Sequence, residues 1–595
     1  TSVFFNGSTY NLIVHTNFIA MRLITILLFL FITSCSNQHQ DWLSYGNDLF
    51  NQRFSELDQI NTTNIDQLDL AWQIQTGTKS SFQATPLVKN GVMYISLPFN
   101  DVIAVDAKTG QEIWRYKHDR NKDWPMCCGP ANRGLGLQGN QLFMGTVDAR
   151  LISLDVKTGK KLWDVNVVNN TVTTETIENL GTHNPLKENF VSGGTGVGMN
   201  MAPVVFHDKV FIGITGVGYG LHVDQDKDAP LGSVVGVKGQ FGRPGFLAAF
   251  DIKTGKKIWQ FDTIASTGWE GQMKNETDDG VPLNRNIEKE KASLTRYPNA
   301  AQFGGGSAWT TPAIDAETNT LIFGIGNPSP QMNGDSRPGD NLYTVSIVAL
   351  DVNTGEKKWH YQQVPHDLWG YDVASPPVIF EKNINNKRVK VVGQAGKTGW
   401  FYMNELTTGQ LIAKSEAFVP QNNMFKNPSE EGVVIYPGIL GGSNWSPVSI
   451  AKTDNLAIVS ALHAPIKYQL HKKNKQNTTE FTSSEPVDGE QYGLLSAIDL
   501  NKGNIAWSYK TEQPLIGGSL STKGGLTFFG EGNGDFNAVE SKSGKLLWSY
   551  HLEAGVNAPA ISYQIEGKQY IAVAVGGNKI FGFKQGDYIS VFSID

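Results

Sequence analysis

A short pattern of apolar and polar positions recurs along the chain. Alternating apolar residues lead into a polar turn of the form Asp-x-x-Thr-Gly, and a Trp follows four residues after the Gly, as in AVDAKTGQEIW ending at Trp114. Alternation with a period of two predicts β-strands. Gly supplies the positive φ that a tight turn needs, and Asp and Thr can bond the local backbone. The pattern therefore predicts a hairpin whose second strand carries the Trp.

Eight marks of this repeat can be counted, and they recur every 41–54 residues, or every 94–100 where a long insertion intervenes. This spacing suits one four-stranded sheet per mark, with the large Trp ring packed between neighbouring sheets. An open β-solenoid is the alternative, but eight marks with long insertions favour a closed ring. We expect an all-β fold, an eight-bladed β-propeller with tryptophan-docking blade repeats. The marks are Trp72 (without the turn), Trp114, Trp163, Trp259, Trp359, Ala413 (a degenerate copy), Trp507 and Trp548.

We expect the first 35 residues to lie outside the fold, because they contain a targeting signal. Residues 21–35, MRLITILLFLFITSC, place one Arg before an apolar run that is too short for a comfortable membrane span and matches a secretory signal. Ile32-Thr33-Ser34-Cys35 also resembles the lipobox of bacterial lipoproteins, in which the Cys is acylated. An ordinary cleaved signal is the alternative. We expect residues 1–20 to be an upstream extension of the gene model, and residues 36–595 to form a single propeller.

The charge and the cysteine content of the chain indicate which partners and cofactors to expect. The chain has a formal net charge of −6, a pI near 6.0 and no block of Lys and Arg, which gives no reason to expect nucleic acid. Of the three cysteines, Cys127 and Cys128 are adjacent. No Cys-x-x-Cys-His occurs in these 595 residues, so we expect no covalently attached c-type haem on this chain.

Long ordered segments carry a family resemblance. Residues 41–72, DWLSYGNDLFNQRFSELDQINTTNIDQLDLAW, resemble the opening of the pyrroloquinoline quinone (PQQ) dehydrogenases almost position by position. Residues 524–548 and 567–577 resemble the family's final blades. The resemblance covers nearly all of residues 41–585. It implies a PQQ pocket on the propeller axis with Ca²⁺ or a lanthanide beside the cofactor.

The resemblance also assigns the pocket. PQQ is a flat tricarboxylic quinone, which requires flat apolar walls and cations. Cys127 and Cys128 match the family's vicinal disulfide, which forms one wall, and Trp309 matches the opposite wall. The remaining residues at cofactor-contact positions are Gln83, Arg133, Thr146, Ser307, Lys397, Asn444 and Trp445.

Three departures bear on catalysis and metal binding. The presumed catalytic Asp of the family's PHDxWDYD segment is Gly370 here, so we assign the base to Asp372, with Lys397 stabilising the reduced cofactor. Asn327 and Asp372 match metal ligands, but the family's metal-binding Glu falls on Gln240 or, in a second register, on Gly218. We prefer Gln240. With Gln83 also standing where a Glu is common, two carboxylates are lost, and we expect metal binding weaker than in the family at large.

These assignments predict an exported, lipid-anchored dehydrogenase on the periplasmic face of a membrane, with Cys35 lipidated and the outer membrane preferred. It would oxidise an alcohol or sugar hydroxyl and pass electrons to a separate cytochrome c or a membrane quinone. The alternative is a catalytically silent propeller that binds PQQ or acts as an assembly scaffold. Gly370 favours the silent reading, whereas Cys127, Cys128, Arg133 and Trp309 favour the enzyme.

Overall fold

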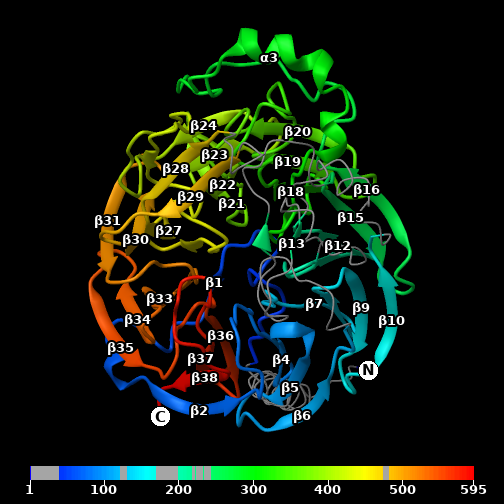
Figure 1. Cartoon of the computed structure of the whole chain (residues 1–595). Helices are drawn as coiled ribbons and strands as arrows, with labels where there is room; N and C mark the ends of the chain where they lie inside the picture. Colours follow the sequence, from blue (N-terminus) through cyan, green and yellow to red (C-terminus); the bar gives the residue numbers. More distant parts are fainter. Residues whose placement is uncertain are drawn as a thin grey trace.

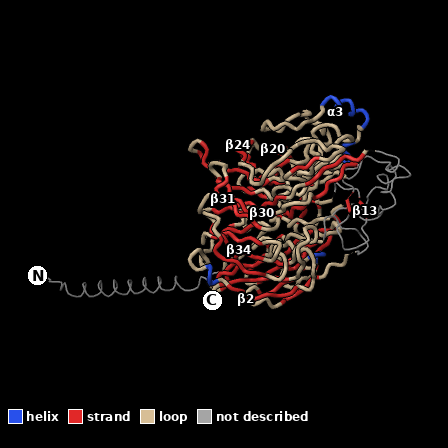
Figure 2. Tube along the Cα trace, turned by 60° about the vertical axis from the view of Figure 1, so that its left-hand side comes forward, coloured by secondary structure: helices blue, strands red, loops and turns tan. Residues whose placement is uncertain are grey.

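Repeated antiparallel sheets build the computed structural model, which describes residues 39–120, 130–168, 198–216, 221–222, 232–233, 243–472 and 481–595, together with residue 1. Within these ranges, eight sheets have four or five strands each. Figure 1 shows them set side by side around a common centre, the arrangement of an all-β propeller. Figure 2 shows that strands dominate and that helix α3 (Ile287–Ser293) stands at the periphery.

We number the sheets 1 to 8 in chain order. Sheet 1 contains β3 (Leu87–Lys89), β4 (Val92–Ser96), β5 (Val102–Asp106) and β6 (Glu112–Tyr116); sheet 2 contains β7 (Gly136–Gln138), β8 (Gln141–Gly145), β9 (Arg150–Asp155) and β10 (Lys161–Asn166). Sheet 3 contains β11 (Val204–Phe206), β12 (Lys209–Gly213), β15 (Phe246–Asp251) and β16 (Lys257–Asp262); sheet 4 contains β17 (Ala313–Asp315), β18 (Thr320–Gly324), β19 (Ser346–Asp351) and β20 (Lys357–Gln362).

Sheet 5 contains β21 (Val378–Ile384), β22 (Lys387–Ala395), β23 (Phe401–Glu405) and β24 (Leu411–Lys414); sheet 6 contains β26 (Ser449–Ala451), β27 (Leu456–His463), β30 (Tyr492–Asp499) and β31 (Ile505–Thr511). Sheet 7 contains β32 (Ser519–Thr522), β33 (Leu526–Gly530), β34 (Asp535–Glu540) and β35 (Leu546–His551), with β1 (Phe54–Ser55) added parallel to β32. Sheet 8 contains β36 (Ile561–Ile565), β37 (Lys568–Val575), β38 (Tyr588–Ser593) and, from the other end of the chain, β2 (Asp69–Gln75).

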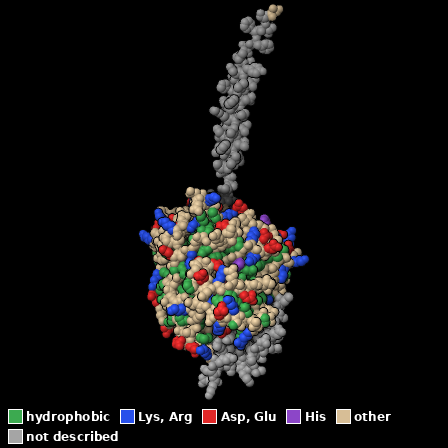
Figure 3. All heavy atoms as spheres, turned by 90° about the horizontal axis from the view of Figure 1, so that it is seen from above, with side chains coloured by type: hydrophobic (Ala, Val, Ile, Leu, Met, Phe, Trp, Pro, Cys, Tyr) green, Lys and Arg blue, Asp and Glu red, His purple; other side chains and the backbone are tan. Residues whose placement is uncertain are grey.

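The smaller elements lie in the connections between these strands. They are the pair β13 (Leu221–His222) and β14 (Gly232–Ser233), the sheet of β25 (Val433–Ile435), β28 (Ile466–His471) and β29 (Phe481–Pro486), and the 3₁₀ turns Ile65–Gln67, Pro98–Asn100, Leu294–Arg296 and Ala300–Phe303. Within the described ranges, no helix is both long and apolar enough to span a membrane. On the face shown in Figure 3, basic and acidic side chains are interspersed.

The repeat forms the hairpin that its residues predict. Asp106 accepts hydrogen bonds from the backbone N–H of Lys108 and Thr109, at 3.0 and 2.8 Å, and Gly110 has a φ of +78°. Third strands such as β5 are buried on both faces, because each sheet is covered on either side by its neighbours, whereas the outermost strand β2 alternates between half-buried and exposed residues.

Each repeat Trp docks on the next sheet. Trp114 donates its indole N–H to the carbonyl of Val156 at 3.0 Å, and its ring covers Gly159 so closely that a Cβ there would lie 2.4 Å from it. The prediction that the Trp packs between sheets is confirmed. The same bond joins Trp163 to Ile252, Trp259 to Val352, Trp359 to Leu406, Trp507 to Ser541 and Trp548 to Leu68.

Candidate active site

All the described candidate residues lie in loops that leave the sheets at one edge. In an antiparallel four-stranded sheet, the loops after the second and fourth strands emerge together, while the loop after the third strand, which carries the repeat turn, emerges at the opposite edge. Thr146, Asn327 and Lys397 follow second strands, namely β8, β18 and β22. The others follow fourth strands: Gln83, Arg133, Ser307, Trp309, Asp372, Asn444 and Trp445. The topology therefore gathers residues more than 300 positions apart on one face.

Arg133 lies between two tryptophans. Its guanidinium carbon is 5.0 Å from the ring centroid of Trp309 and 5.0 Å from that of Trp445, and one amino group lies 3.4 Å from the Trp309 carbonyl. Arg133 and Trp445 are buried, whereas Trp309 is half-buried. A cation over aromatic faces is a favourable contact that also presents flat surfaces to a planar ligand.

The charge of Arg133 is incompletely compensated. Burial lowers its pKa to about 10, and in the described part of the chain Tyr45 is the group whose charge opposes this shift. The Arg133 Nε has no hydrogen-bond partner among the described residues, and neither do the Tyr45 hydroxyl and the Gln83 Oε1. Since buried polar groups are nearly always satisfied, the unpartnered Nε–H donor of Arg133 suits an anionic ligand with hydrogen-bonding oxygens.

A second group centres on Asp372. One carboxylate oxygen accepts a bond from the Asn327 backbone N–H at 2.7 Å, and the other accepts a bond from the Lys397 ammonium at 2.7 Å. Lys397 also donates to the Gly370 carbonyl at 3.0 Å. The Asp372 and Lys397 side chains are 9% and 5% exposed, which makes this a buried ion pair. Two bonds leave about two of the four lone-pair sites of the carboxylate for other donors.

Gly370 adopts a backbone conformation that suits glycine. Its φ is +80°, and a Cβ at this position would lie 2.6 Å from Nε2 of Gln331 and 2.7 Å from Cγ1 of Ile439. Asp367 fixes the turn by accepting the backbone N–H groups of residues 369, 370 and 371. Burial raises the pKa of Asp367 to about 6. Neither Gln331 nor Asp367 is among the residues that the sequence indicates for this site. Asp367 stands within residues 365–372, PHDLWGYD, the segment that resembles the family's PHDxWDYD, whereas no sequence signal marks Gln331.

Backbone bonds join the two groups. The Gly326 N–H, next to Asn327, donates to the Ser307 carbonyl at 2.8 Å, and the Gly442 N–H, near Trp445, donates to the Lys397 carbonyl at 2.7 Å. Two other predicted residues have their polar atoms engaged locally. The Thr146 hydroxyl bonds Asp148, and Asn444 donates to the Leu440 carbonyl. Cys127, Cys128 and Gln240 lie outside the described residues, as do Cys35 and Gly218.

These residues fit PQQ well and a divalent ion only in part. The unpartnered Nε of Arg133 and the two indole faces suit a flat polyanion. For a metal, the described donors are the Asn327 amide oxygen and one carboxylate, Asp372, whose oxygens are already bonded. Among the described residues, no group of three or more His, Cys, Asp and Glu is placed to hold a metal ion.

Comparisons with known proteins agree with this geometry. Residues 42–424 and 419–571 match the model of the PQQ family, described as the glucose/ethanol/alcohol dehydrogenase β-propeller domain. The chain is 32% identical over 586 residues to the quinohemoprotein alcohol dehydrogenase of Comamonas testosteroni, covering 93% of this chain and 75% of that protein. It is 30% identical over 564 residues to the quinoprotein alcohol dehydrogenase PedH of Pseudomonas putida, covering 90% and 86%.

Solved structures give the same result. The crystal structure of the Comamonas testosteroni quinohemoprotein alcohol dehydrogenase superposes with a TM-score of 0.74 at 29% identity, over 93% of this chain and 80% of that one. A europium-containing methanol dehydrogenase also has a TM-score of 0.74, at 24% identity, and shows the shared fold. The matched model spans most of the chain, and the relatives cover it nearly end to end. This chain therefore belongs to the PQQ-dependent β-propeller dehydrogenase family.

Proposed function

We propose that this protein is a PQQ-dependent dehydrogenase that oxidises the CH–OH group of an alcohol. The observation that carries the proposal is Arg133, a buried cation held between Trp309 and Trp445 with its Nε unpartnered among the described residues. The relatives named above are alcohol dehydrogenases, which supports the enzyme over the catalytically silent scaffold. Whether sugar hydroxyls are also accepted is a question for the substrate panel below.

The residues of the candidate site would have distinct roles in binding the cofactor and in proton transfer. Bound PQQ supplies the acceptor for the two electrons that leave the alcohol carbon. Arg133 would bind a carboxylate of the cofactor, and the Trp309 face would lie against its ring. Asp372 is our candidate for the group that accepts the hydroxyl proton, through a lone pair that Asn327 and Lys397 leave free. Lys397 fixes the orientation of that carboxylate from the side of Gly370.

Three further components belong to the proposal. Ca²⁺ or a lanthanide would bind at Asn327 and Asp372 with Gln240, weakly, because Asp372 is the one carboxylate of this set and Lys397 competes for it. Cys127 and Cys128 would form a vicinal disulfide against the cofactor. Electrons would leave through a separate cytochrome c or a membrane quinone.

We also propose that sheets 1 to 8 are the eight blades of one closed ring. Support comes from β2 and β38, which pair the two ends of the chain in sheet 8, and from Trp72, whose ring lies against Gly110 of sheet 1. The signal-like segment 21–35 supports export with lipidation at Cys35, to the periplasmic face of a membrane and, by preference, the outer membrane.

The test is reconstitution of the chain from Ser36 onward with PQQ and either Ca²⁺ or a light lanthanide, followed by dye reduction with a panel of alcohols and sugars. We expect turnover that is lost in Asp372→Ala. Trp309→Ala should lose PQQ while the sheets stay folded, because Trp309 lies outside the docking repeat. PQQ binding without turnover would support the silent propeller, and unchanged PQQ binding in Trp309→Ala would refute the stacking wall.

A further inference from the structure

Gln331 is a buried amide beside the Asp372 group with an unused acceptor. It lies four residues after Asn327, in the loop between β18 and β19, and is 2% exposed. Its Nε2 lies 3.4 Å from the Asn327 Oδ1, which orients the amide. The Gln331 Oε1 has no hydrogen-bond partner in the described part of the chain. The unpartnered atom of this buried side chain is therefore an acceptor and not a donor.

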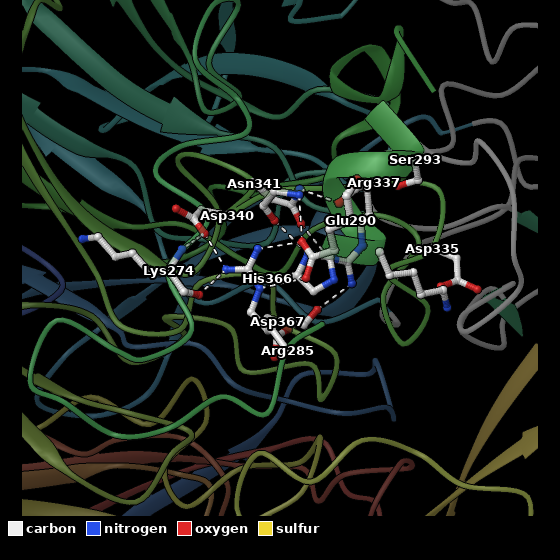
Figure 4. Close-up of polar contacts among 12 residues, drawn as sticks. Lys274, Arg285, Glu290, Ser293, Asp335, Arg337, Asp340, Asn341, His366 and Asp367 are labelled. Carbon is white, nitrogen blue, oxygen red and sulfur yellow. Dashed lines mark hydrogen bonds and ion pairs between the residues drawn. The ribbon is translucent and has the colours of Figure 1, made fainter. Parts of the chain in front are cut away.

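Buried hydrogen bonds from Arg337 hold the loop that carries Gln331. Arg337 is 1% exposed and donates to the backbone carbonyls of Pro330 at 2.7 Å, of Gln331 at 3.2 Å and of Asp367. Figure 4 shows Arg337 directed toward Asp367, with Asn341 beside it. Arg337 thus ties the loop that carries Gln331 to the turn that carries Gly370. These bonds are made to backbone carbonyls, so they hold the loop from which the Gln331 side chain projects.

A second set of bonds, made by Arg285, links the loop around Arg337 to the insertion that contains α3. Arg285 binds Glu290 with two N–H groups, at 3.0 and 2.7 Å, and also binds Asp340. Figure 4 shows this network beside His366, at the start of the segment that leads to Gly370. The loop that carries Gln331 is thus linked through Arg337, Asn341 and Asp340 to the α3 insertion.

The position of Gln331 determines what can reach it. Its Nε2 occupies the space next to Gly370, where a Cβ would lie 2.6 Å away, and Lys397 bonds the Gly370 carbonyl and Asp372 together. Asn327, whose Oδ1 the Gln331 Nε2 bonds, also donates its backbone N–H to Asp372, so a single residue links the Gln331 amide to the Asp372 carboxylate. A buried acceptor without a donor destabilises the protein, so its presence is best explained by a donor that the bound substrate brings.

We propose that the Gln331 Oε1 accepts a hydrogen bond from the substrate's alcohol hydroxyl, or from a second hydroxyl on the same molecule, and so positions the substrate beside Asp372. This inference rests on the proposed function. Gln331 is a substrate-positioning residue in this view. It selects hydroxylated substrates and takes no proton, since an amide oxygen is not a general base.

The test compares Gln331→Met with Gln569→Met in the full chain loaded with PQQ. Gln569 is also fully buried, but its amide accepts from Ile60 at 2.8 Å and donates to Ser562 at 2.9 Å, near the end of β37 remote from the site loops. We expect Gln331→Met to raise the KM for alcohols about tenfold, with little change in kcat and an unchanged or higher melting temperature. Gln569→Met should lower the melting temperature and leave KM unchanged.

A second readout separates this inference from the proposed function. Alcohol should raise the melting temperature of the PQQ-loaded wild type, and Gln331→Met should reduce that shift, even if the wild type shows no turnover. An unchanged KM and an unchanged alcohol-induced shift in Gln331→Met would overturn the inference. So would a loss of stability like that of Gln569→Met without a change in KM, because it would show a structural bond. If alcohol shifts neither protein, the inference fails as well.

Discussion

The buried pair of Asp372 and Lys397 allows a double-mutant test of how the site is held. Asp372→Asn keeps the shape and still accepts the Asn327 N–H, but it leaves the Lys397 ammonium, 5% exposed, without its carboxylate. Lys397→Met leaves the carboxylate with the Asn327 N–H as its described partner. The double variant Asp372→Asn/Lys397→Met buries neither charge.

The expected magnitudes follow from burial. Removing one partner of a buried pair costs about 3–5 kcal/mol, because the other charge stays buried and uncompensated. For a chain of 595 residues, an unfolding entropy of about 2.1 cal/mol/K per residue converts 1 kcal/mol into a shift of roughly 1 °C in melting temperature. Each single variant should therefore melt about 3–5 °C lower. The fall in melting temperature of the double variant should be much smaller than the sum of the falls in the two single variants. This corresponds to a coupling energy of about 2–3 kcal/mol.

The assay is differential scanning calorimetry of the four proteins without PQQ, at one pH and one scan rate, since unfolding of a protein of this size can be irreversible. A surface pair with long flexible side chains, Lys108 and Glu566, provides the matched control. Its double-mutant cycle should give no resolvable coupling, because solvent and salt screen an exposed pair. Additive losses for Asp372 and Lys397 would refute the reasoning, because additivity would mean that neither charge depends on the other in the folded protein.

Three further predictions concern the pocket, the turn and the blades. Arg133→Met should weaken PQQ binding roughly tenfold to a hundredfold by equilibrium titration, since a charged hydrogen bond contributes about 1.5–3 kcal/mol, and an unchanged affinity would contradict the pocket. The raised pKa of Asp367, about 6 against an ordinary 3.8, means that the folded state retains a proton which the unfolded state has released. Stability from this group is therefore present below pH 4 and is lost as pH rises to about 6, by an amount on the order of 3 kcal/mol, and Asp367→Asn should remove that slope when melting temperatures are compared between pH 4 and 7. Trp359→Ala should destabilise the protein by about 3–5 kcal/mol, because the ring is buried and bonded to Leu406, and a loss below 1 kcal/mol would contradict the docking role.

The sequence predicts the sheets well because the repeat is local. Asp106, Thr109 and Gly110 close their turn with bonds inside a few residues, so the pattern is sufficient to place the hairpin. LDLAW at Trp72 lacks that turn for a reason that the structure makes clear. Its strand β2 adds to three strands from the other end of the chain and follows no hairpin of its own.

The sequence indicates which residues lie at the candidate site better than it indicates the hydrogen bonds that they make. Arg133, Trp309 and Trp445 lie together because the propeller topology fixes where their loops emerge, and their binding of PQQ is a proposal. The engagement of both Asp372 oxygens and the approach of Gln331 to Gly370 depend on loop conformations and on side chains such as Arg337. No periodic pattern specifies these contacts, since they join segments through irregular backbone.

The pairing of β2 with β38 sets the order in which the molecule can be completed. Strand β2 bonds only to β38 among the described strands, and β38 lies between β2 and β37. The two paired segments are separated by some 500 residues, so this contact cannot form before the residues of β38 have been synthesised. Removal of Tyr588–Ser593 by a protease would therefore leave β2 without its paired strand, and with it the adjoining Leu68 carbonyl that Trp548 bonds. Loss of β38 would therefore disrupt both sheet 8 and the docking of Trp548 from sheet 7.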